Sequence, residues 1–174
     1  MREERRAAVL VENQYENLEL WYPYLRLKEL GLEVDLIGPE YPKTYLSKEG
    51  YPAVSNTPTI AALDRQYEIL VAPGGMAPDK LRRYPDVLQL VKQVHDGGGI
   101  VASICHGPWV LISAKILKGR HVTCVSAIKD DVENAGAEYS DEEVVIDGKI
   151  VTSRTPKDIP AWMRAIVKLL EQQR

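Results

Sequence analysis

Short runs of apolar residues alternate with segments of helical spacing along most of the chain, and this alternation limits the fold more than any other feature. The runs at residues 7–11, 32–37, 67–72 and 100–104 predict strands. Strands that are apolar on both faces belong in a parallel sheet covered by helices on both sides. The sequence therefore predicts a doubly wound α/β domain with a mostly parallel sheet.

The helical segments lie between and after these strands. The first ends at Gly31, and others are predicted at residues 85–95, 109–117 and 128–135. The first helix places Leu18, Trp21, Tyr22 and Leu25 at helical spacing. The last helix has the clearest apolar stripe, formed by Ile159, Trp162, Met163, Ile166, Val167 and Leu170.

Three stretches are less regular. Residues 39–58 are rich in Pro, Gly and Tyr and predict an irregular excursion with a short hairpin, residues 122–125 predict a strand, and residues 144–152 a strand pair that turns at Asp147-Gly148. No repeat, low-complexity stretch or break in composition divides the chain. We expect one domain covering residues 1–174.

Charge and hydropathy exclude several classes of protein. A net charge of −3 and the absence of a basic cluster argue against nucleic-acid binding. The apolar run at residues 7–11 is far shorter than a signal-peptide core or the roughly 20 residues that span a bilayer. We expect a cytoplasmic protein with no membrane partner.

The two cysteines, Cys105 and Cys124, have no CxxC pattern and no histidine at zinc spacing. The sequence therefore indicates neither a disulfide framework nor a metal site, and each thiol has to be interpreted alone. A lone cysteine most often fills space in a core, and we interpret Cys124 in this way.

Cys105 differs because it stands where a predicted strand turns directly into a helix. A thiol at a helix start feels the positive end of the dipole, which favours the thiolate and predicts a lowered pKa. Gly107, two residues later, permits the tight turn and close packing of a nucleophile elbow. A second strand end carries Gly74 and Gly75, whose backbone can expose amide donors. Ligands of doubly wound sheets bind at such carboxyl ends, so we expect the site there.

Over nearly its whole length the chain resembles the ThiJ/PfpI family of intracellular peptidases, protein deglycases and glyoxalases. No single motif is specific, but their combination in this order is. The motifs are Asn13-Gln14-Tyr15-Glu16 with Glu19-Leu20, Pro73-Gly74-Gly75-Met76-Ala77-Pro78-Asp79, Ala102-Ser103-Ile104-Cys105-His106-Gly107-Pro108, Asp130-Asp131 with Asn134-Ala135-Gly136, and Thr152-Ser153-Arg154-Thr155-Pro156.

The resemblance implies a flavodoxin-like fold, similar to class I glutamine amidotransferases, with Cys105 as the nucleophile. It implies that Glu16 bonds the sulfur as a protonated carboxyl, with a pKa raised by the facing thiolate. His106 would be the general base, oriented by Asp79 from a neighbouring subunit. Without the resemblance, Glu16 and His106 could each simply begin a helix, and Asp79 could be an ordinary turn carboxylate.

The resemblance also implies an oxyanion site made by the backbone amides of Gly75 and His106, no metal, no organic cofactor, and a homodimer or homohexamer. The sequence itself tests the oxyanion site only through Gly74 and Gly75, which could also form a plain turn. The segment from Tyr22 to Tyr24 is a candidate contact between subunits, although its aromatic side chains could also be core.

The favoured function is a glyoxalase or deglycase that acts on methylglyoxal, related dicarbonyls or their early protein adducts through a hemithioacetal on Cys105. One alternative is a cysteine peptidase or amidase with a triad completed across subunits. Another is a non-enzymatic sensor of oxidative stress or a holdase, in which Cys105 is oxidised. Val125 stands where members of the family often have Tyr, which makes the substrate unsafe to transfer.

Overall fold

A mostly parallel sheet forms the centre of the computed structural model, which describes residues 4–173. Within these residues the sheet has seven strands in the order β10-β11-β7-β6-β1-β2-β5, and only β10 runs antiparallel to its neighbour. The strands are β1 (Arg6–Leu10), β2 (Glu33–Gly38), β5 (Thr57–Pro58), β6 (Ile69–Ala72), β7 (Ile100–Ile104), β10 (Val144–Asp147) and β11 (Ile150–Ser153). The predicted doubly wound α/β architecture is confirmed.

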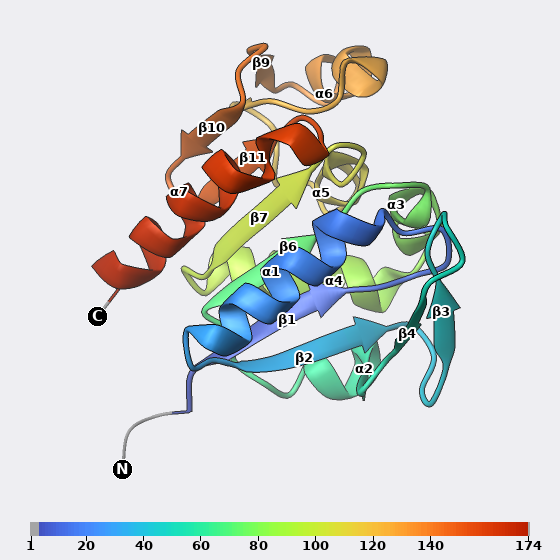
Figure 1. The fold of residues 1–174 in the computed structure, drawn as a ribbon. Coiled ribbons are helices and arrows are strands. Elements are labelled where there is room, and N and C mark those ends of the chain that lie inside the picture. Colours follow the sequence, from blue (N-terminus) through green and yellow to red (C-terminus); the bar gives the residue numbers. More distant parts are fainter. Residues whose placement is uncertain (1–3, 174) are drawn as a thin grey trace.

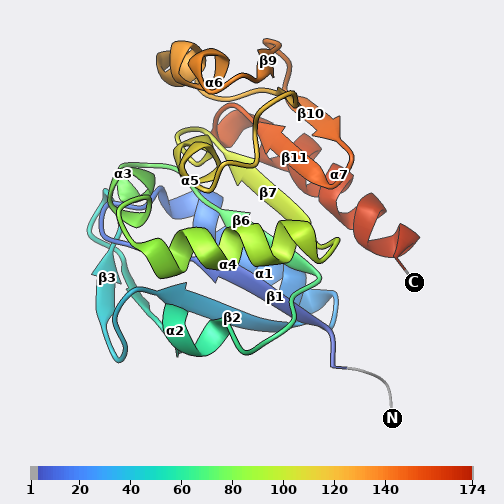
Figure 2. The same ribbon diagram turned by 180° about the vertical axis from the view of Figure 1, so that it is seen from behind.

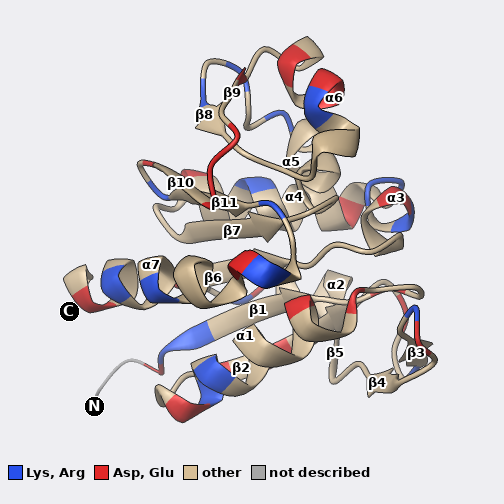
Figure 3. Cartoon of the chain, turned by 45° about the horizontal axis from the view of Figure 1, so that its top comes forward, with Lys and Arg blue, Asp and Glu red and all other residues tan. Residues whose placement is uncertain are grey.

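Helices cover both faces of the sheet. Helices α1 (Asn17–Glu29) and α7 (Ile159–Gln172) lie on one face (Figure 1), and α2 (Thr59–Ala62), α4 (Pro85–Asp96) and α5 (Pro108–Ser113) lie on the other (Figure 2). The central strands β6 and β7 have no charged residue, and both are buried throughout. Figure 3 shows the charged residues of both signs spread over the helices and loops around them. This distribution is expected for strands enclosed on both sides.

The chain order reverses next to β1, which lies between β6 and β2. After β2 and the edge strand β5 the chain returns to the other side of β1 and continues outward through β6 and β7. In doubly wound sheets the crevice at such a reversal receives the ligand. The carboxyl ends of β1, β6 and β7 are therefore the place to look for a site.

The predicted hairpin within residues 39–58 is present as β3 (Thr44–Leu46) and β4 (Pro52–Val54). Its Tyr45 is buried against Gly38, where an added Cβ would lie 2.6 Å from the phenol oxygen. The hairpin is thereby fixed beside the end of β2. It brings the turn at Lys48 towards the carboxyl ends of the strands.

Two local predictions are corrected. The strand expected at 122–125 is the shorter β8 (His121–Val122), which pairs with β9 (Glu138–Tyr139) outside the main sheet. Helix α5 ends at Ser113, well before residue 117. A short helix α3 (Ala77–Leu81), which has no counterpart among the predicted elements, follows β6. The remaining elements are the 3₁₀ turns Ser126–Ile128 and Pro156–Asp158 and helix α6 (Lys129–Asn134).

The inward face of α1 does not follow the apolar residues that stand at helical spacing in the sequence. The side chains of Leu18 and Leu25 are 57% and 60% exposed, whereas Glu19, Pro23 and Leu27 are buried. The inward row thus includes a carboxylate. Among residues 4–173, none of the helices is both long enough and apolar enough to cross a membrane.

Candidate active site

The turn after β7 holds Cys105 in a conformation that residues with a side chain rarely adopt. Its φ is +62°, and its backbone N–H donates to the carbonyl of Ser153 (3.1 Å) while its carbonyl accepts from the N–H of Val125 (3.2 Å). A left-handed residue costs roughly 1 to 3 kcal/mol, and such strain concentrates at functional sites. Cys105 is also partly exposed. These features favour Cys105 as the reactive thiol.

Gly107 lies where no side chain fits. A Cβ there would stand 2.3 Å from the carbonyl oxygen of Ala72 and 2.4 Å from Oγ of Ser103. Backbone oxygen of the neighbouring strand cannot move away from such a contact without disturbing the sheet. The close packing under the elbow that the sequence predicts is therefore confirmed.

The turn after β6 packs its glycine backbone against the thiol. A Cβ on Gly74 would lie 2.7 Å from Cβ of Cys105, and Gly75 has φ +74° with no room beside the carbonyl of Gln14. The backbone N–H groups of Gly75 and His106 lie near the sulfur of Cys105 and lower the pKa of the thiol. The amide pair named from the sequence thus faces the thiol, and its role as an oxyanion site stays a prediction.

The carboxyl that faces the sulfur belongs to Glu19, and the prediction that Glu16 bonds it is wrong. Glu16 is the N-cap of α1, where its Oε2 accepts from the N–H of Glu19 at 2.8 Å. Glu19, in the first turn of the helix, is fully buried, and its Oε2 accepts from the N–H of Gly74 at 3.3 Å. A Cβ on Gly74 would meet both this oxygen (2.8 Å) and Cβ of Cys105 (2.7 Å), so the carboxyl lies beside the thiol. Among the described residues, its Oε1 has no hydrogen-bond partner.

Burial raises the pKa of Glu19 to about 8, and the nearby charge of Glu16 adds to the rise. The N–H of Gly74, the thiol of Cys105 and the charge of Lys48 oppose it. Glu19 therefore carries a proton at neutral pH. The protonated carboxyl that the family resemblance implies is present, but on the residue one helical turn further along.

Burial also raises the pKa of the Cys105 thiol, to about 12, with a further rise from the Glu19 carboxylate. The N–H groups of Gly75 and His106 lower it. The expectation of a lowered pKa is wrong because α5 has only six residues and begins three positions beyond the thiol, so desolvation outweighs its dipole. At neutral pH the sulfur holds its proton and needs a base.

His106 is placed to be that base. Its Nδ1 lies 3.4 Å from Sγ of Cys105, and its ring packs against that of Trp109 with centroids 5.0 Å apart. Burial lowers its pKa, the charge of Lys48 lowers it further, and Asp131 raises it. The imidazole is therefore neutral at neutral pH and able to accept a proton.

Lys48 is a site residue that the sequence does not reveal. It lies on the hairpin turn, and its backbone N–H donates to the carbonyl of Tyr15 at 3.0 Å. Tyr15 in turn forms isolated bridges with Ser47 and Gly75. Since the hairpin reaches the site only through these distant contacts, no local pattern around Lys48 could have indicated it.

The other candidate residues lie apart from the thiol. The side chain of Asp79 forms an ion pair with Arg83 on the surface of α3, and within the described part of the chain no hydrogen bond or ion pair joins Asp79 to His106. Its action across a subunit boundary stays a prediction. Cys124 is fully buried, as predicted for a core residue.

Residues 4–173 contain no group of three or more His, Cys, Asp or Glu side chains arranged to hold a metal ion.

Comparison with known proteins places this chain in a family. The model described as the DJ-1/PfpI family matches residues 5–169. A deglycase of Pyrococcus horikoshii is 44% identical over 162 residues, covering 93% of this chain and 97% of the relative. General stress protein 18 of Bacillus subtilis is 39% identical over 170 residues, covering 97% and 99%.

A solved structure agrees with these matches. The crystal structure of a two-domain protein with DJ-1/ThiJ/PfpI-like and ferritin-like domains from Anabaena variabilis has a TM-score of 0.93 and 38% identity. The match covers 96% of this chain and 48% of that longer one. The resemblance inferred from the motifs around Cys105 is confirmed, and the chain belongs to the DJ-1/PfpI family.

Proposed function

We propose that this chain is a cysteine-dependent deglycase and glyoxalase that acts on methylglyoxal and related dicarbonyls, free or as early adducts on protein side chains. The name of the Pyrococcus horikoshii relative supports deglycation, and that of the Bacillus subtilis relative supports a role in stress. The observation that carries the proposal is the strained Cys105, whose sulfur faces two amide donors, a carboxyl and an imidazole.

The first step is addition of the sulfur to the aldehyde carbon of the dicarbonyl. As the S–C bond forms, the thiol proton passes to Nδ1 of His106, 3.4 Å away, and the carbonyl electron pair moves to oxygen. The N–H groups of Gly75 and His106 stabilise that developing charge. Return of the proton to this oxygen gives a hemithioacetal.

A free dicarbonyl and a protein adduct then follow different courses. In the hemithioacetal of methylglyoxal, His106 moves the proton of the former aldehyde carbon to the neighbouring ketone carbon. The hydroxyl proton passes to the former ketone oxygen, so the carbon bound to sulfur becomes the carbonyl of a thioester. Water hydrolyses the thioester to a hydroxy acid and restores the thiol. In a carbinolamine adduct, the S–C bond replaces the C–N bond, and the protein amine leaves with the thiol proton. Neither course needs an oxidant.

Glu19 and Lys48 tune this chemistry. The Glu19 carboxyl is protonated up to about pH 8, so it donates a hydrogen bond to an anionic sulfur and leaves the pocket with one negative charge, where a carboxylate would add a second. Lys48 lowers the pKa of His106 and so keeps the imidazole neutral. Its positive charge also favours substrates that carry or develop negative charge.

Turnover of methylglyoxal by purified protein tests the proposal, with release of amines from methylglyoxal-treated lysine peptides as the second substrate. Cys105→Ser should abolish both reactions, and Cys124→Ala, which removes the other thiol, should keep them. Loss of a thiol nucleophile should lower the turnover rate by several orders of magnitude. Equal turnover by Cys105→Ser and the unmodified protein contradicts the mechanism.

Two other outcomes identify the alternatives. Cleavage of peptide amides that depends on Asp79 and on oligomer assembly supports the peptidase. Absence of turnover with every dicarbonyl, together with reversible oxidation of Cys105 by peroxide, supports the sensor.

A further inference from the structure

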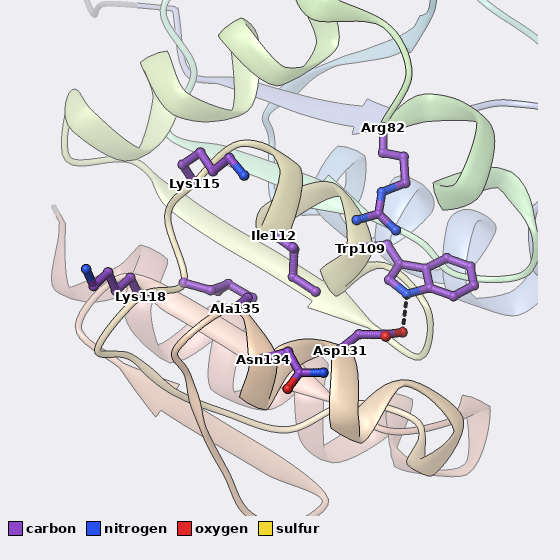
Figure 4. A pocket seen from close by; sticks show the side chains of 9 residues that line it. Arg82, Trp109, Ile112, Lys115, Lys118, Asp131, Asn134 and Ala135 are labelled. Atoms are coloured by element: carbon purple, nitrogen blue, oxygen red, sulfur yellow. Dashed lines mark hydrogen bonds between the residues drawn. The ribbon is translucent and has the colours of Figure 1, made fainter.

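A cavity of about 550 Å³ lies next to Trp109, between α5, α6 and the residues that follow α3 and α5 (Figure 4). Arg82, Lys115, Lys118, Asp131 and Asn134 contribute its polar lining. Neither Cys105 nor His106 lines it. The cavity is thus separate from the thiol site, although the ring of Trp109 also contacts that of His106.

The charges around this cavity do not balance. Three cations and the single carboxylate of Asp131 line it, and the ion pairs found within residues 4–173 include none of Arg82, Lys115 and Lys118. In Figure 4 the side chains of Arg82 and Lys115 extend towards the cavity opposite Asp131 and Asn134, whereas the amino group of Lys118 points away from it, so two cations face one carboxylate. A hollow with excess positive charge favours an anionic ligand.

Two contacts fix the side chain of Arg82 in a position suited to bind such a ligand. Its Nε donates to Oγ of Ser113 at 2.9 Å, and its guanidinium lies over the ring of Trp109, 5.7 Å from the centroid. Among the described residues the hydrogen bonds of this side chain use Nε alone. The terminal N–H groups remain for a ligand, and a fixed guanidinium loses little entropy when it binds a phosphate.

Lys115 occupies a position that usually belongs to glycine. Its N–H bonds the carbonyl of Ile112 at 3.0 Å, and the N–H of Ile116 bonds that of Leu111 at 3.3 Å. This pair of bonds is a Schellman motif, and Lys115 has the left-handed φ, +62°, that the motif requires. A lysine there is strained where a glycine would not be. The strained residue directs its amino group to the cavity (Figure 4).

The remaining walls combine the Trp109 ring and the apolar side chains of Ile112, Leu117 and Ala135 with the polar side chains of Asp131 and Asn134. The Trp109 indole is held by a hydrogen bond from Nε1 to Oδ2 of Asp131 at 2.8 Å, so its ring has a fixed orientation. Asp131 and Asn134 offer acceptors and donors for hydroxyls. A flat aromatic wall with polar groups beside it is typical of pockets that bind small molecules in one orientation.

We propose that this cavity binds a small phosphorylated sugar. The phosphate contacts Arg82 and Lys115, the hydroxyls bond Asn134 and Asp131, and the carbon skeleton packs on Trp109. The proposal is independent of the function proposed for Cys105.

Titration of ribose 5-phosphate into Cys105→Ser protein tests it, since this background excludes chemistry at the thiol. The indole N–H signals of Trp21, Trp109 and Trp162 are followed by NMR, and we expect a saturating shift of Trp109 alone. Ribose and inorganic phosphate serve as the two halves of the ligand, and each should bind more weakly by about tenfold or more.

Lys115→Gly is the decisive variant because it relieves backbone strain and so keeps the fold. It should weaken ribose 5-phosphate binding by about tenfold, as should Arg82→Gln. Lys92→Gln, which removes an exposed cation that lies outside the cavity, should leave affinity unchanged. Unchanged affinity in Lys115→Gly, equal binding of inorganic phosphate, or no shift of Trp109 at millimolar ligand overturns the proposal.

Discussion

Oε2 of Glu16 accepts a hydrogen bond from the backbone N–H of Glu19 at 2.8 Å, so one glutamate caps the helix that carries the other into the thiol site. The first glutamate also raises the pKa of the second through its charge. Glu16 therefore influences the sulfur through Glu19. The effects of the two residues on Cys105 can be distinguished by substituting each one alone.

Replacing each glutamate by glutamine should change the reactivity of Cys105 in different ways. In Glu19→Gln the charge that raises the thiol pKa is lost, so the pH profile of iodoacetamide alkylation should shift to lower pH and lose any inflection near pH 8. In Glu16→Gln the pKa of Glu19 should fall, and that inflection should move to lower pH. Matching profiles in the two variants would contradict the assignment of Glu19 to the sulfur.

Glu19 should also make stability depend on pH. Its pKa is about 8 in the folded chain, against 4.5 for an ordinary glutamate. Between these values the folded state holds a proton that the unfolded state has released, so stability falls as pH rises, by about 1.4 kcal/mol per pH unit. Urea unfolding at pH 5 and pH 7.5 measures this. The fall should be smaller in Glu19→Gln, and an equal fall in both proteins would refute the raised pKa.

Lys48 and Asp131 should shift the titration of His106 in opposite directions. Lys48→Gln removes a charge that lowers the pKa of His106, and Asp131→Asn removes one that raises it. We expect the imidazole pKa, measured by NMR, to rise in the first variant and fall in the second. A common direction for both would mean that structural change, rather than charge, governs this histidine.

Gly75 and Gly50 form a matched pair for a test of steric fit. Both have positive φ, +74° and +82°, but a Cβ on Gly75 would lie 2.4 Å from the carbonyl oxygen of Gln14, whereas a Cβ on Gly50 meets no atom within 4 Å. Gly50→Ala should cost roughly 1 to 2 kcal/mol of unfolding free energy from backbone strain alone. Gly75→Ala should cost more and should slow alkylation of Cys105. If denaturant unfolding shows the same loss of unfolding free energy in both variants, the contact with Gln14 adds no destabilisation.

The central fold follows from apolar patterning because its strands are buried on both faces. The run predicted at residues 100–104 coincides with β7, and that at 7–11 lies within one residue of β1. Patterning fails on α1, where Glu19 and Pro23 face inward while Leu18 and Leu25 face outward. A hydrophobic pattern assigns carboxylates to solvent, so it inverts the face of a helix that supplies a buried acid to a site.

The parts of the site that depend on backbone geometry are predictable. Gly75 and Gly107 are the residues that tight turns require, and they locate Cys105 between them. The partners of the thiol are harder to predict from the sequence. Glu16 and Glu19 are both plausible partners, and only the capping bond in the structure shows which of them caps the helix. Lys48 lies on a hairpin that is distant in the sequence. Whether the pKa of the thiol is raised or lowered depends on its burial, which cannot be predicted from the local sequence pattern.

The backbone of Tyr15 connects two segments that are distant in the sequence. It forms one bridge with Ser47 of the hairpin and another with Gly75 in the turn after β6. A displacement of the hairpin would therefore be transmitted through Tyr15 to Gly75, whose amide lowers the pKa of the thiol. If the chain carries out the proposed reaction, we therefore expect substitutions in the hairpin to change the selection among aldehydes without any change in the groups that perform the chemistry.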